Sequence, residues 1–483
     1  MNANDAGNAA KVRKLLKHPV LDADGHWVES QPVFLEYLRE VAGAKLTDEF
    51  IGLSELNKSW HQASPAERLE RRLRRPQGSF YPTDTRERAT AMLPGLMQER
   101  MGELGFDFSI IYPSNGLFYT TLFKDELRRA SVRAYNIMVS ETYAPYGRTF
   151  APAAIIPTYT PQEAIEELDY AVGQLGCKVA MFRGALPRAL MPADGLAGTH
   201  ESVLRRFPYY IDPIGFESPH NYDPVWRKCV ELKVAATFHG GSHDWADRKS
   251  VNSYVFNHIG HFAQGNHVIC KGLFLAGVNR RFPDLNFAFL EGGVGYAVSL
   301  LWDLVGHWEK LNPKAMREYL DPGKTDLDAL RKLIMQYGLP RTKSKVDEII
   351  EGHQKTKGDF YEDFGRLEFS RKSDLIEQFS RSFYFGCEAD DPVTTWAFDK
   401  RTGATLKAIL GSDVSHFDVP EMVEVLPEAY EMVEKKWLTD DDFEEFAFSN
   451  AIRLHGGMNK DFFKGTTLEQ AAAPILAATA AIA

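Results

Sequence analysis

The sequence predicts an α/β protein whose main domain is a distorted (β/α)8 barrel. Eight short apolar runs, typical of strands buried on both faces of a parallel sheet, alternate with longer amphipathic stretches. Three of these runs end in the Asp and His side chains that bind metals, and a barrel gathers its chemistry at the carboxyl ends of its strands. A doubly wound sheet has the same alternation. We favour the barrel because only a closed ring brings together ligands from non-neighbouring strands.

The eight predicted strands are short and mostly apolar. The segments between them read as helices; one is predicted to begin at Pro161, because Thr160 is a good N-cap and proline suits the first helical position. Apolar residues then recur at three- and four-residue steps, which is typical of an amphipathic helix. The predicted strands cover residues 20–26, 108–112, 153–157, 178–183, 234–239, 287–291, 383–387 and 405–410.

Three connections are too long for simple barrel loops, and loops of that length usually serve as lids or interfaces. We expect long helical insertions after strands one, four and six, at about residues 30–100, 185–225 and 310–380. They could instead only cap the barrel or build a dimer contact. The predicted organisation is an N-terminal extension, a barrel domain with insertions and a C-terminal tail, at residues 1–19, 20–456 and 457–483.

Composition narrows the class of protein. Of 483 residues, 56 are Lys or Arg and 66 are Asp or Glu, which leaves a formal net charge of −10. That charge argues against a nucleic-acid partner, and no apolar run is long enough to span a bilayer. The four cysteines form no C-x-x-C pair, and the first ten residues have no apolar signal-peptide core. We therefore expect a cytoplasmic protein with reduced thiols.

Four side chains at predicted strand ends form a candidate metal site. Asp24 and His26 are two residues apart on a strand and so leave from the same face. His239 ends the fifth predicted strand and Asp413 follows the eighth. Two imidazoles and two carboxylates suit Zn, Mn or Fe better than Mg or Ca. Each residue alone is more often a structural hydrogen-bonder or a helix cap, and the joint pattern is what favours a metal.

Several motifs around these residues resemble the amidohydrolase superfamily, in particular its amidohydrolase-related branch with the aminocarboxymuconate-semialdehyde decarboxylase-like enzymes. The resemblance runs from about Val20 to Gly456. The combination of motifs is specific, although each alone is weak. The motifs are D-A-D-G-H at 22–26, F-H-G-G at 238–241, R-R-F-P-D-L-N-F-A-F-L-E-G-G-V-G-Y at 280–296, G-S-D-V-S-H-F-D at 411–418 and S-N-A-I-R-L-H-G at 449–456.

The resemblance implies a catalytic divalent metal held by Asp24, His26, His239 and Asp413. Zinc is the expected ion, with Mn or Fe as alternatives; one ion is favoured and two are not excluded. Some members of the superfamily bridge two metals with a carboxylated lysine from strand four. This chain has Arg183 at the end of that strand, so no such bridge is expected.

One departure from the family pattern concerns strand six, where many relatives carry His-Gly-Gly and this chain carries Glu291-Gly-Gly. Glu291 could act as a general base, as a ligand that supports a second ion, or as a partner that orients a ligand histidine. It could also be a carboxylate that is merely salt-bridged at the rim. Asp413, Glu291 and His239 are the candidate catalytic residues.

Four further residues are candidates for substrate binding. Arg183 could bind a substrate carboxylate through its planar guanidinium, or could only neutralise the carboxylates of the site. Trp27 and Trp245 could line an apolar pocket, although core packing explains them as well, and His243 lies in the loop after strand five.

The preferred hypothesis is a metal-dependent hydrolase that attacks an amide, ester, thioester or carbon–carbon bond next to a ketone in a small, partly apolar substrate. The first alternative is a non-oxidative, metal-dependent decarboxylase of an aromatic or unsaturated acid, a reaction also found in this branch. The second is an inactive barrel that serves as a binding protein. The resemblance also implies a homodimer or a higher homo-oligomer.

Overall fold

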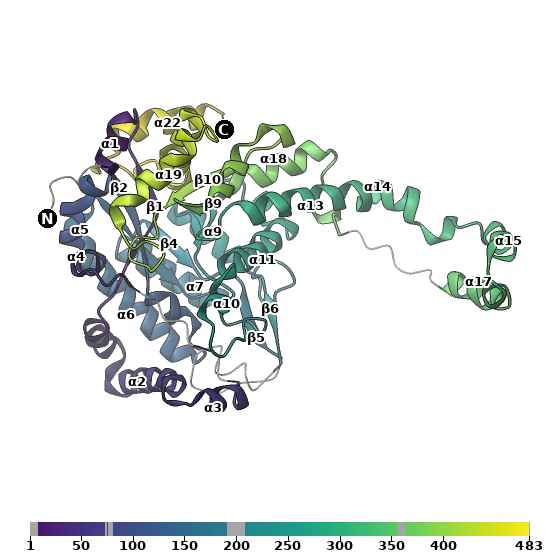
Figure 1. The fold of residues 1–483 in the computed structure, drawn as a ribbon, viewed down its shortest axis with the longest axis horizontal. Coiled ribbons are helices and arrows are strands. Elements are labelled where there is room, and N and C mark those ends of the chain that lie inside the picture. Colours follow the sequence, from purple (N-terminus) through teal and green to yellow (C-terminus); the bar gives the residue numbers. More distant parts are fainter. Residues whose placement is uncertain (1–7, 73–74, 76–80, 191–207, 356–362, 483) are drawn as a thin grey trace. The chain divides into compact units, whose positions relative to one another are not determined.

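Eight parallel strands form a single sheet, in the order β1-β2-β3-β4-β7-β8-β9-β10 (Figure 1). The structure is a computed structural model, and it describes residues 8–72, 75, 81–190, 208–355 and 363–482. All eight strands predicted from the sequence are present. They span Leu21–Trp27 (β1), Phe108–Pro113 (β2), Phe150–Ile156 (β3), Val179–Phe182 (β4), Ala236–Phe238 (β7), Phe287–Phe289 (β8), Phe383–Glu388 (β9) and Lys407–Gly411 (β10).

The sheet curves until the end of its last strand meets its first strand. The backbone N–H of Asp413, just after β10, donates to the carbonyl oxygen of Asp24 on β1 at 3.0 Å. The backbone N–H of Ser412 donates to the carboxylate of Asp22 on β1, also at 3.0 Å. The predicted fold is therefore confirmed: the chain forms a nearly closed (β/α)8 barrel of the α/β class.

Alternation along each strand separates the barrel interior from an aromatic layer under the helices. On β7, Phe238 points outward and lies 6.3 Å, ring to ring, from Trp226 of helix α9 (Asp223–Leu232). Trp226 also contacts Phe182 of β4 and Phe287 of β8, at 5.9 and 5.8 Å. Since neighbouring residues of a strand face opposite sides, His239 at the end of β7 points into the barrel. Burial of each aromatic ring stabilises the fold by about 2–3 kcal/mol.

Helices fill the connections between consecutive strands, as expected for this fold (Figure 1). The helix predicted at Pro161 is α7 (Pro161–Leu168), and it begins with a capping box between Thr160 and Glu163. The other helices of this layer are α6 (Asp125–Tyr143), α10 (Tyr254–His258), α11 (His261–Leu275), α12 (Val278–Arg281), α13 (Gly295–Leu311), α18 (Lys372–Ser382), α19 (Val425–Glu434) and α21 (Asn450–Gly456).

The three long insertions differ in structure. The first, after β1, is helical as predicted and contains α2 (Gln31–Gln62), α3 (Pro65–Glu70), α4 (Thr85–Met92) and α5 (Pro94–Leu104). The second, after β4, holds an antiparallel pair of strands that the sequence pattern did not reveal, β5 (Leu186–Ala189) and β6 (Tyr209–Asp212). The helix expected in this insertion has no counterpart in its described residues; residues 191–207 lie outside the description.

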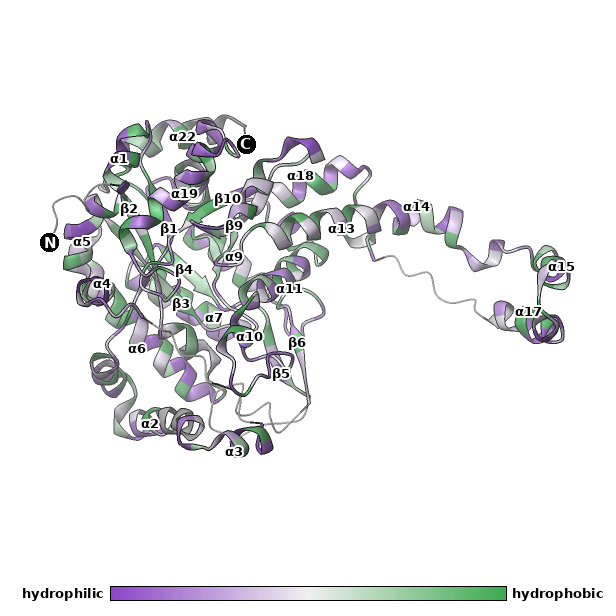
Figure 2. Cartoon of the chain, in the orientation of Figure 1, coloured by the Kyte–Doolittle hydropathy of each residue, from purple (hydrophilic) through white to green (hydrophobic). Residues whose placement is uncertain are grey.

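The third insertion forms a compact unit of its own. By internal contacts, residues 301–377 separate from a larger unit made of residues 1–300 and 378–483. Large apolar side chains in the smaller unit are exposed to solvent, and Figure 2 shows the hydropathy along its helices. They are Tyr319, Leu320, Leu333, Met335, Tyr337 and Leu339. The helices within this unit are α14 (Pro313–Ala315), α15 (Leu327–Tyr337), α16 (Pro340–Lys343) and α17 (Val346–Lys355).

The Ala-rich end of the sequence forms helix α22 (Glu469–Ile482), which packs against α21 of the same chain. Ala472 is buried in this contact, and a Cβ added at Gly456 would lie 2.6 Å from Leu476 Cδ2. Among the helices that the structure describes, none has both the length and the apolar character needed to cross a membrane.

A buried carboxylate fastens the exit of β1 to the exit of β2. Glu29 accepts hydrogen bonds from the backbone N–H groups of Asn115 and Gly116, at 2.7 and 2.9 Å. Burial raises the pKa of Glu29 to about 7, although these two hydrogen bonds favour the ionised form.

The stability of the protein should therefore carry a pH-dependent contribution from Glu29. Because its folded-state pKa is raised, this contribution is fully present below about pH 4.5 and is lost as the pH rises through about 7. We expect the unfolding free energy of the wild type, measured against a Glu29→Gln variant by urea denaturation, to fall by up to about 3 kcal/mol across this window. Parallel pH profiles for the two proteins would contradict the assignment.

Candidate metal centre

Two polar side chains of β1 point into the barrel. Asp24 and His26 are two residues apart, so they share one face, and both are buried. The pairing of β1 with β2 shifts register between Asp22 and Gly25, so the buried carboxylate of Asp22 lies on the side of Gly25 instead. Gly25 has no room for a side chain, because a Cβ there would lie 2.4 Å from Asp22 Oδ2 and 2.6 Å from Ser109 Oγ. The close packing of β1 against β2 therefore needs glycine at this position.

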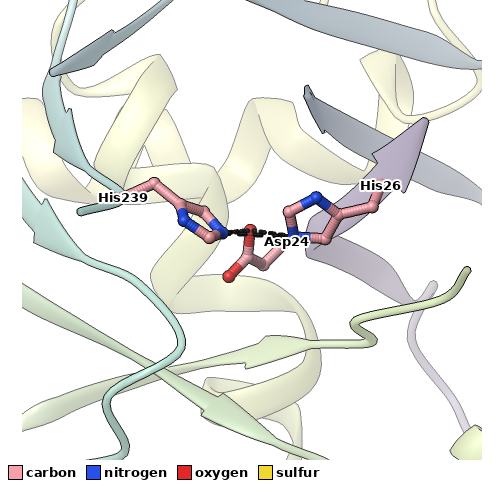
Figure 3. Close-up of side chains that lie close together, drawn as sticks. All are labelled: Asp24, His26 and His239. Atoms are coloured by element: carbon pink, nitrogen blue, oxygen red, sulfur yellow. Dashed lines mark hydrogen bonds and ion pairs between the residues drawn. The ribbon is translucent and has the colours of Figure 1, made fainter. Parts of the chain in front are cut away.

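Asp24, His26 and His239 converge at the carboxyl end of the barrel (Figure 3). The two imidazole Nε2 atoms lie 3.1 Å apart, and Asp24 Oδ1 lies 3.4 Å from that of His239 and 3.7 Å from that of His26. Two ligands bound to one ion at about 2.1 Å are separated by roughly 3.0–3.4 Å when the angle between them is 90–110°. The observed distances match a shared ion to within a few tenths of an ångström.

Asp413 completes the predicted set of four ligands. Its Oδ1 atom lies 3.3 Å from His26 Nε2 and accepts a hydrogen bond from His416 Nδ1 at 2.6 Å. The residue adopts a left-handed backbone conformation with φ of 46°, which is rare for a residue with a side chain and is typical of functional sites.

The unsatisfied polar atoms of the cluster fit a divalent cation. Among the described residues, Asp24 Oδ1 and Asp413 Oδ2 are buried without a hydrogen-bond partner. His26 Nδ1 lies 3.1 Å from the carbonyl oxygen of Pro113 and must donate to it, which leaves the lone pair of Nε2 directed at the cluster. Burial lowers the pKa of His26 well below its usual value, and the neighbouring His416 and His239 lower it further. A neutral imidazole is the form that binds a metal.

Glycines explain how the F-H-G-G segment holds His239 in place. A Cβ at Gly240 would lie 1.5 Å from the carbonyl oxygen of Arg183, and one at Gly241 would lie 1.9 Å from His261 Nδ1. Both contacts are shorter than any side chain tolerates. The chain after β7 therefore packs directly on the end of β4 and on helix α11, which orients the imidazole of His239 into the barrel.

Glu291 lies beside the predicted ligands. It follows β8 with a left-handed backbone (φ 56°), and its Oε2 atom lies 3.4 Å from His239 Nε2. Burial raises the pKa of Glu291 well above its usual value, and the carboxylates of Glu388 and Asp24 add to this effect. The sequence also allowed Glu291 to be a carboxylate that is merely salt-bridged at the rim. Among the ion pairs of the described residues, the only partner of Glu291 is His239, so this role has no support.

Sequence reasoning did not single out three other residues of the site. His416 receives a hydrogen bond from Ser114 Oγ at 3.0 Å through Nε2 and donates one to Asp413 through Nδ1. Glu388 ends β9 and Asp418 lies in the loop after β10, and both come close to Glu291. The sequence pattern could have indicated them, because Glu388 stands at the carboxyl end of a predicted strand and His416 and Asp418 follow shortly after one.

The four proposed substrate-binding residues lie away from the two cavities next to the cluster. Arg183 forms a buried ion pair with Asp244 at 2.5 Å. Trp27 donates to the carbonyl oxygen of Met92 and packs on Tyr143. His243 is buried with its ring 5.4 Å from that of His261, and Trp245 is buried in the same loop.

Two cavities adjoin the candidate ligands. The smaller, of about 30 Å³, lies over Asp413, Glu291 and His416. The larger, of about 260 Å³, continues past Glu291 to Glu388 and Asp418. Apolar and aromatic side chains line the smaller one, namely Leu117, Phe118, Tyr254, Phe262 and Phe417. At this volume the smaller cavity has room for about two water molecules, and only the larger one approaches the size of a small-molecule site.

Comparison with protein families agrees with this geometry. A family model described as Amidohydrolase matches residues 22–341, which is more than half of the chain. The chain belongs to this amidohydrolase family. The matched residues include Asp24, His26, His239 and Glu291. The match ends before β9 and β10, so it does not cover Asp413, which only the structure places beside the other three predicted ligands. No curated protein matches this amidohydrolase.

Solved structures share the fold at low identity. An amidohydrolase from Mycobacterium avium subsp. paratuberculosis K-10 is 16% identical, with a TM-score of 0.53 over 91% of this chain and 100% of that one. A dihydroxybenzoic acid decarboxylase from Polaromonas sp. JS666, with bound manganese and the inhibitor 2-nitroresorcinol, is 13% identical. Its TM-score is 0.51, over 92% of this chain and 99% of that chain.

The packing around Gly25 can be tested by a single substitution. Gly25→Ala should destabilise the protein by about 2–4 kcal/mol, because the added methyl group overlaps Asp22 and Ser109. Gly102→Ala is the matched control: this glycine lies within helix α5 with no atom near an added Cβ, and the change should stabilise by up to about 1 kcal/mol. Equal unfolding midpoints in urea for the two variants would refute the close packing.

Proposed function

We propose that this amidohydrolase is a metal-dependent hydrolase in which Asp24, His26, His239 and Asp413 bind one divalent ion. The proposal is carried by one observation: two imidazole nitrogens and a carboxylate oxygen, all buried, lie 3.1–3.7 Å apart, and the carboxylate oxygen has no hydrogen-bond partner among the described residues. The donor set of two nitrogens and two carboxylates suits Zn, Mn or Fe. An ion bound there would lower the pKa of a water molecule and polarise a substrate carbonyl.

The residues around this site can move a proton. Asp413 uses Oδ1 to accept from His416, so its Oδ2 remains available to take a proton from an attacking water. Ser114 and His416 form a chain of hydrogen bonds behind Asp413 and hold its orientation. Glu291, 3.4 Å from His239, is close enough to return a proton to the leaving group. The aromatic side chains over the site exclude bulk water.

Decarboxylation of a small aromatic acid is the second candidate. It is favoured by the aromatic rings of Phe262 and Phe417, which line both cavities, and by the likeness in fold to a manganese-bound decarboxylase. In that reaction Glu291 would donate a proton to carbon. Arg183, which the sequence suggested for a substrate carboxylate, is paired with Asp244 instead, so the substrate anion would need another cation.

Metal content is the first test of the proposal. Protein purified without a metal-affinity tag should contain at least one Zn, Mn or Fe per chain by mass spectrometry. An Asp24→Ala/His239→Ala variant should lose that metal, whereas Asp303→Asn, an exposed carboxylate of α13, should keep it. A folded wild type that takes up no metal even after reconstitution would overturn the proposal and favour an inactive binding barrel.

Isotope labelling separates the two reactions. A panel of amides, esters, thioesters, diketones and aromatic acids is incubated with the loaded enzyme in ¹⁸O-labelled heavy water. Hydrolysis places ¹⁸O in the product carboxylate, whereas decarboxylation releases carbon dioxide and places deuterium on carbon. In either case Asp413→Asn should lower kcat by at least about 100-fold, since it removes a ligand and a proton acceptor. Full activity of this variant would contradict the role of Asp413.

We also propose that the protein is a homo-oligomer. The exposed apolar side chains of residues 301–377 support this, because large apolar patches on soluble proteins mark interfaces. Light scattering should give a mass of at least two chains, and a Tyr337→Glu/Leu339→Glu variant should shift it towards one. A monomeric wild type would exclude the oligomer.

A further inference from the structure

We infer that His258 binds the substrate, and that the group it holds is an uncharged hydrogen-bond acceptor such as the carbonyl oxygen of an amide or ester. This inference rests on the proposed function and deepens it, because it names the class of substrate that the hydrolase takes. His258 ends helix α10, and His261 begins helix α11. Gly260 between them has φ of 69°, which lets the chain turn sharply and brings the two imidazoles together.

His258 faces both cavities next to the proposed metal centre. It lines the smaller one together with Asp413, and it lines the larger one where that cavity continues past Glu291. Of the described side chains that line both cavities, His258 alone carries a nitrogen that can donate a hydrogen bond; the others are Phe262, Glu291, Phe417 and Asp418. A ligand in the larger cavity that extends toward Asp413 therefore meets this imidazole.

Aromatic rings hold the imidazole of His258 in a fixed orientation. Tyr254, one helical turn earlier, stacks on it with ring centroids 4.8 Å apart. Phe417 and His261 contact it edge-on, at 5.4 and 4.6 Å. Within the described part of the chain, the ring of His258 makes these contacts and no hydrogen bond. Its nitrogens are thus left for a ligand, and little side-chain freedom is lost when one binds.

His261 gives a second, independent reason to expect a polar ligand at this wall of the larger cavity. It lines that cavity and is only 1% exposed, yet neither of its ring nitrogens has a hydrogen-bond partner among the described residues. Buried polar groups in folded proteins are normally hydrogen-bonded, because leaving one unpaired costs free energy. The two imidazoles therefore form a polar wall whose nitrogens the protein itself does not satisfy.

The larger cavity holds no fixed positive charge. Its described lining contains neither Lys nor Arg. Burial lowers the pKa of His258; Asp418 opposes this effect and Arg248 adds to it. A neutral imidazole donates one hydrogen bond and carries no charge at neutral pH.

The remaining polar groups of the larger cavity make it unfavourable for an anion. They are the carboxyl groups of Glu291, Glu388, Asp391 and Asp418. Burial raises the pKa of Glu388 to about 8, and a carboxyl group that keeps its proton is neutral but still supplies no cation. A substrate carboxylate here would lose its water without gaining a positive partner, whereas a carbonyl oxygen needs only the N–H of an imidazole. The cavity therefore favours amides and esters over aromatic acids.

Benzamide and benzoate test this preference, because they have the same shape and differ in charge. Their dissociation constants are measured by calorimetry with the metal-loaded protein and again with chelator-stripped protein, so that direct binding of benzoate to the ion is separated from binding to the cavity. We expect benzamide to bind at least about tenfold more tightly than benzoate in both samples.

A His258→Phe variant tests the residue itself, since it keeps the ring packing against Tyr254 and Phe417 and removes both nitrogens. It should bind benzamide about five- to tenfold more weakly, the loss expected for one hydrogen bond, and should keep its metal. His258→Gln, which retains an N–H donor, should recover part of the affinity. His307→Phe is the matched control: this exposed histidine of α13 lines neither cavity, and its replacement should change neither dissociation constant.

The outcomes separate this inference from the proposed function, because metal content is measured in the same samples. A wild type that holds its metal but binds benzoate as tightly as benzamide, or binds neither, would overturn the inference and leave the function standing. Unchanged benzamide affinity in a folded His258→Phe variant would overturn it too; if that variant does not fold, the wild-type preference and His258→Gln decide. A wild type without metal that binds benzamide through His258 would instead overturn the proposed function.

Discussion

The buried carboxylate of Asp22 is the contact on which both the barrel and its site depend. It accepts hydrogen bonds from Ser109 on β2, at 2.5 Å, and from both the backbone N–H and the hydroxyl of Ser412 after β10, at 3.0 and 2.9 Å. One side chain of β1 thus joins the strands on either side and closes the ring. Because Asp24 and Asp413 each lie within two residues of this junction, its geometry sets the distance between two of the four proposed metal ligands. Burial raises the pKa of Asp22 to about 6, and the hydrogen bonds it accepts oppose that rise.

The sequence was sufficient for features that depend on local pattern. All eight strands were found from short apolar runs, and Asp24, His26, His239 and Asp413, predicted because strand ends collect chemistry in a barrel, lie close together in the structure. The role of Asp22 was missed because it depends on how β10 curves back to β1, which no local pattern encodes. The pairing of β5 with β6 was missed for a similar reason. The two strands are far apart in the sequence, so no short hairpin turn indicates that they pair.

Substrate-binding residues were harder to predict than candidate metal ligands, because the type of a residue does not indicate the direction in which its side chain points. Trp27 is adjacent to His26 and therefore leaves the strand on the opposite face, where it packs on Tyr143. Arg183 directly follows β4, but Asp244 lies 2.5 Å from its guanidinium and neutralises it. Residues with no distinctive motif, such as Phe118 and Tyr254, reach the cavity from loops and short helices whose course only the structure reveals.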